Sequence, residues 1–152
     1  MRAMRVFTVL AAVAVIGVAC GDTVTGIPAG VEIFTATLNG ANERPTPVTT
    51  TARGTAVITV LGNLVSWKVD ITAAIDSVTI GHIHKGVADS AGGVILNLSP
   101  TPTGIGFTGT VAVGSATVAD SVLTHMRNGR AYVNIHTRVN GGGEIRGQTV
   151  KQ

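Results

Sequence analysis

Apolar and polar residues alternate along most of the chain from Val31 onward, which is the pattern of β-strands with one buried face. The segment 64–71 shows the alternation most clearly, because every second residue in it is apolar. These apolar residues are Val65, Trp67, Val69 and Ile71. Trp67 is the only tryptophan of the chain, and its place on the apolar face predicts a core residue rather than a platform for a ligand.

Turn residues separate the apolar runs. Gly62 and Asn63 lie between two alternating segments, which is typical of a tight β-hairpin. The predicted strands cover residues 31–38, 53–60, 64–71, 77–84, 94–98, 105–113, 131–138 and 144–150. A set of about eight or nine short strands predicts one all-β domain, built as an antiparallel β-sandwich or barrel.

One segment departs from this alternation. Between Thr117 and Asn128, apolar residues recur at every fourth position, so we predict one short helix there. Thr117 is the predicted N-cap, and Gly129 is the predicted residue at the C-terminal end.

The composition supports a strand-rich fold. The chain is 45% hydrophobic, only 3% aromatic and 12% charged, and it contains 20 glycines; this mixture favours strands joined by glycine-rich turns. Without Arg2 and Arg5, which belong to a predicted export signal, 9 basic residues face 8 acidic ones. No cluster of Lys and Arg remains in the sequence, which argues against nucleic acid as a partner.

The first residues form the predicted export signal. Arg2 and Arg5 precede an apolar segment, residues 6–18, that has the length of a signal-peptide core and is short for a membrane span. We therefore predict a signal peptide over residues 1–19.

Cys20, the only cysteine, follows this segment directly. The arrangement is similar to a bacterial lipoprotein signal, except that Gly17 stands where such signals usually have Leu. We predict a lipidated Cys20 with a tether over residues 20–30 and a domain over 31–152; cleavage without lipidation is the alternative. The lipid would hold the domain at a membrane of the bacterial cell envelope, in the periplasm or at the cell surface.

Three histidines are the candidate metal ligands. His82 and His84 lie two residues apart on a predicted strand, so their side chains project from one face, about 6.6 Å apart; Val78 has the same parity. His136 lies on a later predicted strand. We predict a three-imidazole site for Cu or Zn, with Glu144 as an acceptor that orients one ring. The alternative is that these histidines only hydrogen-bond backbone groups near a strand end.

Polar residues near the last strand complete the candidate site. Glu144 and Arg146 share a face of this strand, and we expect Arg146 to contact a carboxylate such as Glu144 or Glu43. Asn134 lies on the same face of its strand as His136 and joins these structural polar residues. Recognition of an anion or of a partner is the alternative role.

Four short motifs follow one another between residues 34 and 148. They are Phe34-x-Ala-x-Leu-x-Gly40 with Ala41-Asn42-Glu43-Arg44-Pro45, Gly81-His82-Ile83-His84-x-Gly86, Gly129-x-x-Tyr132-Val-Asn-Ile-His136-Thr137, and Gly143-Glu144-Ile145-Arg146-Gly147-Gln148. In this order they resemble the CHRD domain family, named after chordin and also found in secreted microbial proteins. The resemblance implies a β-sandwich, immunoglobulin-like in broad terms, in an exported protein, and it brings no enzyme activity. The His-x-His strand is also similar to the copper-binding strand of Cu,Zn superoxide dismutases, another β-sandwich family.

Two functions follow from these observations. The first is a non-catalytic binding module that contacts a protein or polysaccharide partner through loops, for which 39–51 and 99–104 are predicted. The alternative is a metal-binding protein, with redox activity if the metal is copper. The sequence lacks the motifs of other enzyme classes, because it has no credible Ser-His-Asp order and no glycine-rich phosphate loop before a helix.

Overall fold

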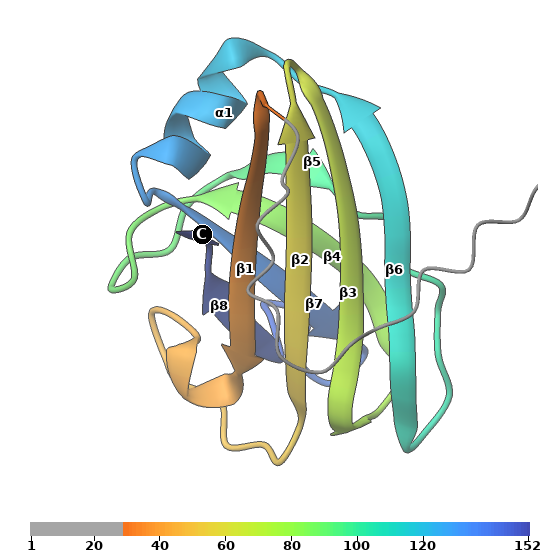
Figure 1. Ribbon diagram of the computed structural model, residues 1–152. Coiled ribbons are helices and arrows are strands. Elements are labelled where there is room, and N and C mark those ends of the chain that lie inside the picture. Colours follow the sequence, from red (N-terminus) through yellow and green to blue (C-terminus); the bar gives the residue numbers. More distant parts are fainter. Residues whose placement is uncertain (1–28) are drawn as a thin grey trace, which may run out of the picture.

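The computed structural model describes residues 29–152, which form one antiparallel sheet and one short α-helix (Figure 1). The predicted signal peptide, Cys20 and most of the tether lie outside these residues. The strands are β1 (Val31–Asn39), β2 (Arg53–Leu61), β3 (Leu64–Ile75), β4 (Val78–Lys85), β5 (Val94–Asn97), β6 (Phe107–Thr117), β7 (Ala131–Thr137), β8 (Ile145–Gln148) and β9 (Val150–Lys151). The helix is α1 (Asp120–Arg127), and a 3-10 turn covers Gly40–Asn42. Among the described residues, no helix is long and apolar enough to cross a membrane.

The strands form a single sheet in the order β5-β4-β7-β8-β1-β2-β3-β6, with β9 beside β1. The sheet curls, so that β4 and β7 lie behind β1, β2 and β3 in Figure 1. The prediction of an all-β antiparallel fold with one short helix is confirmed, while the two layers of the predicted sandwich are the two halves of one curled sheet. Trp67 Nε1 on β3 donates to the carbonyl of Leu98, just after β5, at 3.1 Å, which joins the halves across the interior.

The hydrophobic core lies between these halves. Alternate residues of β1, β2 and β3 are buried, as the sequence pattern predicts, and Trp67 is only 7% exposed. The core residues of the described part of the chain fall between Phe34 and Ile145. Strand β7 differs from the others because all seven of its residues are buried. Its second buried face carries polar side chains, and it forms the candidate site.

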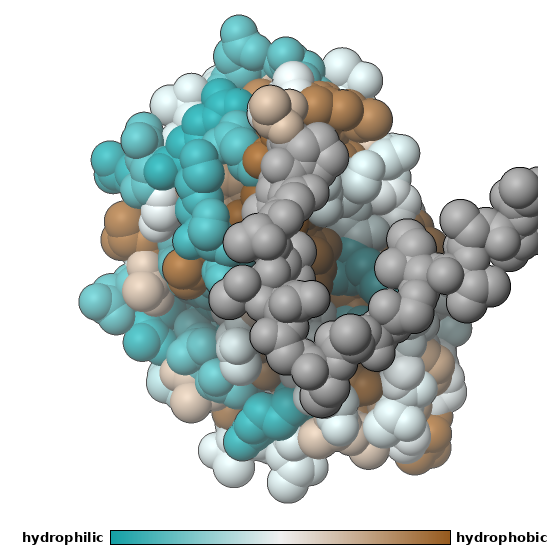
Figure 2. All heavy atoms as spheres, in the orientation of Figure 1, coloured by the Kyte–Doolittle hydropathy of each residue, from teal (hydrophilic) through white to brown (hydrophobic). Residues whose placement is uncertain are grey.

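Helix α1 packs one apolar side against the core through Val122, Leu123 and Met126. Figure 2 shows that its outer side is hydrophilic. The predicted N-cap is wrong: the helix begins at Asp120 with Ala119 as its N-cap, and Thr117 is the last residue of β6. Thr117 pairs with Leu64 on β3, so the strand ladder extends through the residue that would otherwise cap a helix. Gly129, with a φ of 65°, ends the helical region as predicted.

A β-bulge sets the direction of the histidines. The pairing of β4 with β7 shifts between Val78 and Ile80, which places Val78 in the core and leaves Ile80 exposed. The expectation that Val78 lies on the same face of the strand as His82 and His84 is therefore wrong, because one extra residue reverses the faces of a strand. The bulge lets the strand begin in the core and still direct both histidines outward.

Candidate metal site on the outer face of β4 and β7

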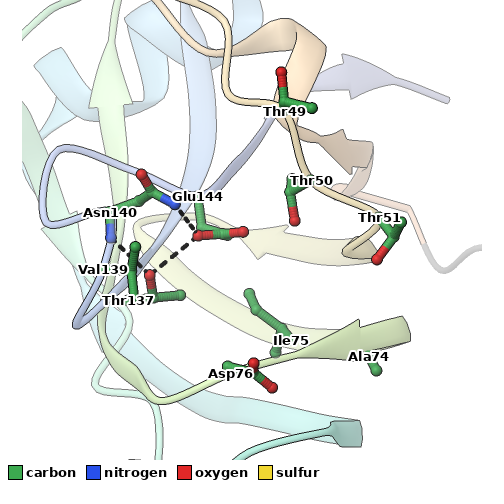
Figure 3. A pocket seen from close by; sticks show the side chains of 10 residues that line it. All are labelled: Thr49, Thr50, Thr51, Ala74, Ile75, Asp76, Thr137, Val139, Asn140 and Glu144. Atoms are coloured by element: carbon green, nitrogen blue, oxygen red, sulfur yellow. Dashed lines mark hydrogen bonds between the residues drawn. The ribbon is translucent and has the colours of Figure 1, made fainter.

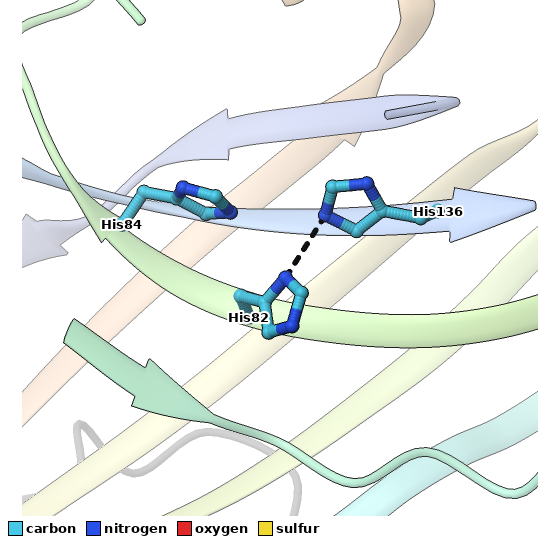
Figure 4. A group of neighbouring side chains, drawn as sticks. All are labelled: His82, His84 and His136. Atoms are coloured by element: carbon cyan, nitrogen blue, oxygen red, sulfur yellow. Dashed lines mark hydrogen bonds between the residues drawn. The ribbon is translucent and has the colours of Figure 1, made fainter. Parts of the chain in front are cut away.

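The three predicted ligands come together on the outer face of β4 and β7 (Figure 4). Strand pairing sets His82 opposite Asn134 and Ile80 opposite His136, so His82 and His136 are diagonal neighbours. Nδ1 of His82 lies 3.1 Å from Nε2 of His136. With one nitrogen taken from each of the three rings, all of these atoms lie within 4.8 Å of one another.

Backbone carbonyls determine which nitrogen of each buried ring is free. Nδ1 of His84 lies 2.8 Å from the carbonyl oxygen of Gly92, and Nδ1 of His136 lies 3.0 Å from that of Gly141. A carbonyl oxygen can only accept, so each Nδ1 carries the proton and each Nε2 keeps its lone pair. Nε2 of His84 is buried and has no hydrogen-bond partner in the described part of the chain.

The spacing of two of the three nitrogens fits a shared ion. Two imidazole nitrogens bound to the same tetrahedral zinc, each at about 2.05 Å, are about 3.3 Å apart. The 3.1 Å between His82 Nδ1 and His136 Nε2 is close to this value. A cavity of about 300 Å³ borders His82 and is also lined by Asn97 and Pro100.

The environment keeps the three imidazoles neutral. Burial lowers the pKa of His82, of His84 and of His136, and for His136 the pKa falls to about 4. The neighbouring rings lower the pKa of His136 further, since a positive charge on one opposes a charge on the next. Neutral imidazole is the form that coordinates a metal, so protons compete weakly for this site at neutral pH.

A stack of three side chains supports His84 from β7 and β8. The His84 and Tyr132 rings are nearly parallel, with centroids 5.0 Å apart, and Cζ of Arg146 lies 3.5 Å from the centroid of the Tyr132 ring. Because β4 and β8 flank β7, the tyrosine ring lies between the imidazole and the guanidinium. The tyrosine hydroxyl also accepts a hydrogen bond from the backbone N–H of Gly92, whose carbonyl faces His84.

The expected contact between Arg146 and a carboxylate is wrong. Nη2 of Arg146 instead donates to the carbonyls of Val87, Ala88 and Ser90, at 2.8, 3.3 and 2.9 Å. Arg146 therefore holds the loop between β4 and β5 over the outer face. This loop also carries Gly92, so Arg146 acts on His84 both through Tyr132 and through the loop.

Glu144 does not orient a histidine. Its Oε2 accepts hydrogen bonds from the hydroxyl of Thr137 and the amide of Asn140. The carbonyls of Gly92 and Gly141 face the two Nδ1 atoms instead. Sequence reasoning missed these two groups, because every residue has a carbonyl and only the fold decides where it points.

Glu43 is a further buried polar residue of this face, and it is only 3% exposed. Asn134 Nδ2 donates to its Oε2 at 3.3 Å, while Oε1 of Glu43 and Oδ1 of Asn134 are both buried and have no hydrogen-bond partner among the described residues. Both of these oxygens lie 2.7 Å from the point that a Cβ on Gly143 would occupy. Burial raises the pKa of Glu43 to about 7, although the charge of Arg146 opposes this shift. A protonated Glu43 can donate from Oε1 to Asn134 Oδ1, which would satisfy both atoms.

The variant Glu43→Gln is expected to gain stability relative to the parent as pH rises. The carboxyl titrates near 4.5 when unfolded and near 7 when folded, so the folded parent binds more protons between these values and loses stability there as pH increases. The difference in unfolding free energy should grow by roughly 2–3 kcal/mol between pH 4 and pH 8. Urea unfolding of the metal-free proteins measures it.

Glu32→Gln is the matched control for this experiment. Hydrogen bonds from Arg127 and Lys151 lower the pKa of Glu32 to about 2, so its contribution is already present above the unfolded value of 4.5. The difference in unfolding free energy between Glu32→Gln and the parent should therefore stay nearly constant above pH 5. His136 affects stability in the opposite direction to Glu43, because the folded state loses stability as pH falls from 6.5 toward 4. This effect is the same in the parent and in each variant, so it cancels in their difference. If the difference in unfolding free energy between Glu43→Gln and the parent did not change with pH, the proposed pair of protonated Glu43 and Asn134 would be wrong.

One family of known proteins matches most of the described chain. The CHRD domain matches residues 34–149, a range that begins in β1, ends after β8 and includes the three histidines. No curated protein and no solved structure matches the chain. Since the match covers well over half of the sequence, the chain belongs to the CHRD domain family.

Proposed function

We propose that this CHRD domain is a non-catalytic binding module of the cell envelope whose ligand is a Cu²⁺ or Zn²⁺ ion held by His82, His84 and His136. The observation that carries the proposal is the convergence of three neutral imidazoles, with Nε2 of His84 buried and without a partner in residues 29–152. A bound ion would provide the partner that this nitrogen lacks, and an unpaired buried polar atom otherwise destabilises the fold.

The donor set favours these two metals. Imidazole is a ligand for both Zn²⁺ and Cu²⁺, and affinities of a given nitrogen site usually rank Cu²⁺ above Zn²⁺. Three protein ligands leave one position for water or for another molecule. Metal binding by itself does not provide a substrate site, which is why we propose a binding role; redox activity of a copper-loaded sample is the alternative.

The location and the partners of the domain form part of the same proposal. The basic and apolar residues before Cys20 support export, and a lipid on Cys20 would hold the domain at a membrane. A protein or polysaccharide partner would contact the loops at 39–51 and 99–104, which lie outside the strands of the sheet.

Elemental analysis of residues 22–152, purified without chelators, tests the metal site. We expect about one equivalent of Cu or Zn in the parent, because the three histidines form one site, and no metal in a His82→Ala/His84→Ala variant. An unchanged far-ultraviolet spectrum of the variant would show that it is still folded. The chelated parent should regain thermal stability when either metal is added, because a ligand that binds only the folded state stabilises it. A parent that stays metal-free and shows no thermal shift with either ion would exclude the site.

A further inference from the structure

A second cavity, of about 400 Å³, lies apart from the histidines, none of which lines it. It is formed by the end of β3, by the loop at 49–51 and by residues 137–144 (Figure 3). Its volume near 400 Å³ lies within the usual range of about 300–1,000 Å³ for pockets that hold small ligands.

Glu144 supplies a free acceptor in this cavity. The residue is only 9% exposed, and its Oε2 is held by Thr137 and Asn140. Its Oε1 receives no hydrogen bond within the described part of the chain, and Figure 3 shows the carboxylate directed into the pocket. A half-enclosed carboxylate oxygen attracts a positively charged donor more strongly than one in open water, because the local dielectric is lower.

The remaining walls complement such a donor. Asp76 adds a second carboxylate, whose Oδ1 accepts a hydrogen bond from the backbone N–H of Gly106 at 2.6 Å, and Thr50 directs its hydroxyl toward the cavity (Figure 3). Among residues 29–152, no Lys, Arg or His lines the cavity, so no described residue of its walls neutralises the negative charge of the carboxylates. Ile75, which is 2% exposed, and Val139, which is 83% exposed, are apolar residues of the lining.

These features select one class of cation. A bare Ca²⁺ ion requires 6–8 oxygen ligands within about 2.3–2.6 Å, and a cavity this large with apolar residues in its lining would surround it poorly. Sugars and nucleobases usually stack on aromatic rings, and no aromatic residue of the described chain lines the cavity. We propose that the cavity binds a primary ammonium group at the end of a short aliphatic chain, as in a lysine side chain, with Glu144 as the counter-ion and Ile75 beside the methylene groups.

An NMR titration of ¹⁵N-labelled residues 22–152 with Nα-acetyl-lysine methylamide tests this site. We expect saturable shifts of the amides of Ile75, Thr137 and Glu144, with a dissociation constant in the millimolar range or tighter. The norleucine analogue has a similar aliphatic chain without the charge, and it should cause no saturable shift. Glu144→Gln retains an acceptor for Thr137 and Asn140, and it should weaken binding of the lysine probe at least about tenfold.

Controls separate the alternatives. Asp120→Asn removes an exposed carboxylate on α1 and should leave the affinity for the lysine probe unchanged. Equal binding of the norleucine analogue, or saturable shifts with Ca²⁺ and none with the lysine probe, would overturn the proposal. The comparison of the lysine probe with its norleucine analogue uses only the parent chain, so it tests the proposal even if Glu144→Gln fails to fold. The metal site is tested independently of this titration.

Discussion

Replacing Arg146 with methionine is expected to lower the free energy of unfolding by roughly 4 kcal/mol. Arg146 is 1% exposed, and its guanidinium donates to three loop carbonyls and stacks on Tyr132. Methionine fills much of the same volume, but it leaves these carbonyls without their donor. It also removes a positive charge that lowers the pKa of the buried Glu43.

Urea unfolding measures this loss, and hydrogen exchange locates it. We expect faster exchange in the loop at 86–93, because Arg146 joins this loop to β8. Arg138→Met is the matched control, since Arg138 is exposed at the end of β7, and it should change stability by less than about 0.5 kcal/mol. A loss below about 1 kcal/mol for Arg146→Met would show that the guanidinium does not hold the loop.

The variant His84→Phe is expected to separate metal binding from folding. Phenylalanine can keep the stack on Tyr132 and removes the unpartnered Nε2, although it loses the hydrogen bond to Gly92. We expect the stability of the metal-free chain to change by no more than about 1 kcal/mol. The affinity for Cu²⁺ or Zn²⁺ should fall by about 1,000-fold, roughly 4 kcal/mol, because one of three ligands is lost.

Competition titration against a chelator of known affinity measures this change, with circular dichroism as the test of folding. His125→Phe is the control, because His125 lies on α1, away from the three clustered rings, and its affinity should stay within about twofold of the parent. Equal metal affinity of His84→Phe and the parent would remove His84 from the ligand set. A His84→Phe chain that fails to fold would instead assign the ring a structural role.

Much of the fold follows from local patterns. The alternation of residues 64–71 correctly indicates which face of β3 is buried, and Gly62 and Asn63 correctly mark a hairpin between β2 and β3. The predictions were wrong where pairing with a neighbouring strand decided the outcome. Thr117 joins β6 because Leu64 lies opposite it, and Val78 enters the core because of a bulge. Neither pairing can be deduced from the residues on one strand alone.

The candidate site shows the same limit. The spacing of His82 and His84 indicates two imidazoles on one face, and His136 stands out as a further ligand type. The sequence gives no measure of the 3.1 Å between His82 and His136, which arises from the diagonal register of β4 and β7. The partners of Arg146 were also unpredictable, since they are backbone carbonyls of a loop 56–59 residues away in the chain.

Local sequence patterns are enough to establish the all-β class, the buried face of most strands, the short helix and the residue types able to bind a metal. These properties depend on side-chain period and turn chemistry, which act within a few residues. The folded chain is needed to see that one sheet curls into two layers, that both faces of β7 are buried, and that Glu43 and Glu144 lie in different surroundings. Those features depend on strand register and on loops folding over a face, which bring together residues that are distant in sequence.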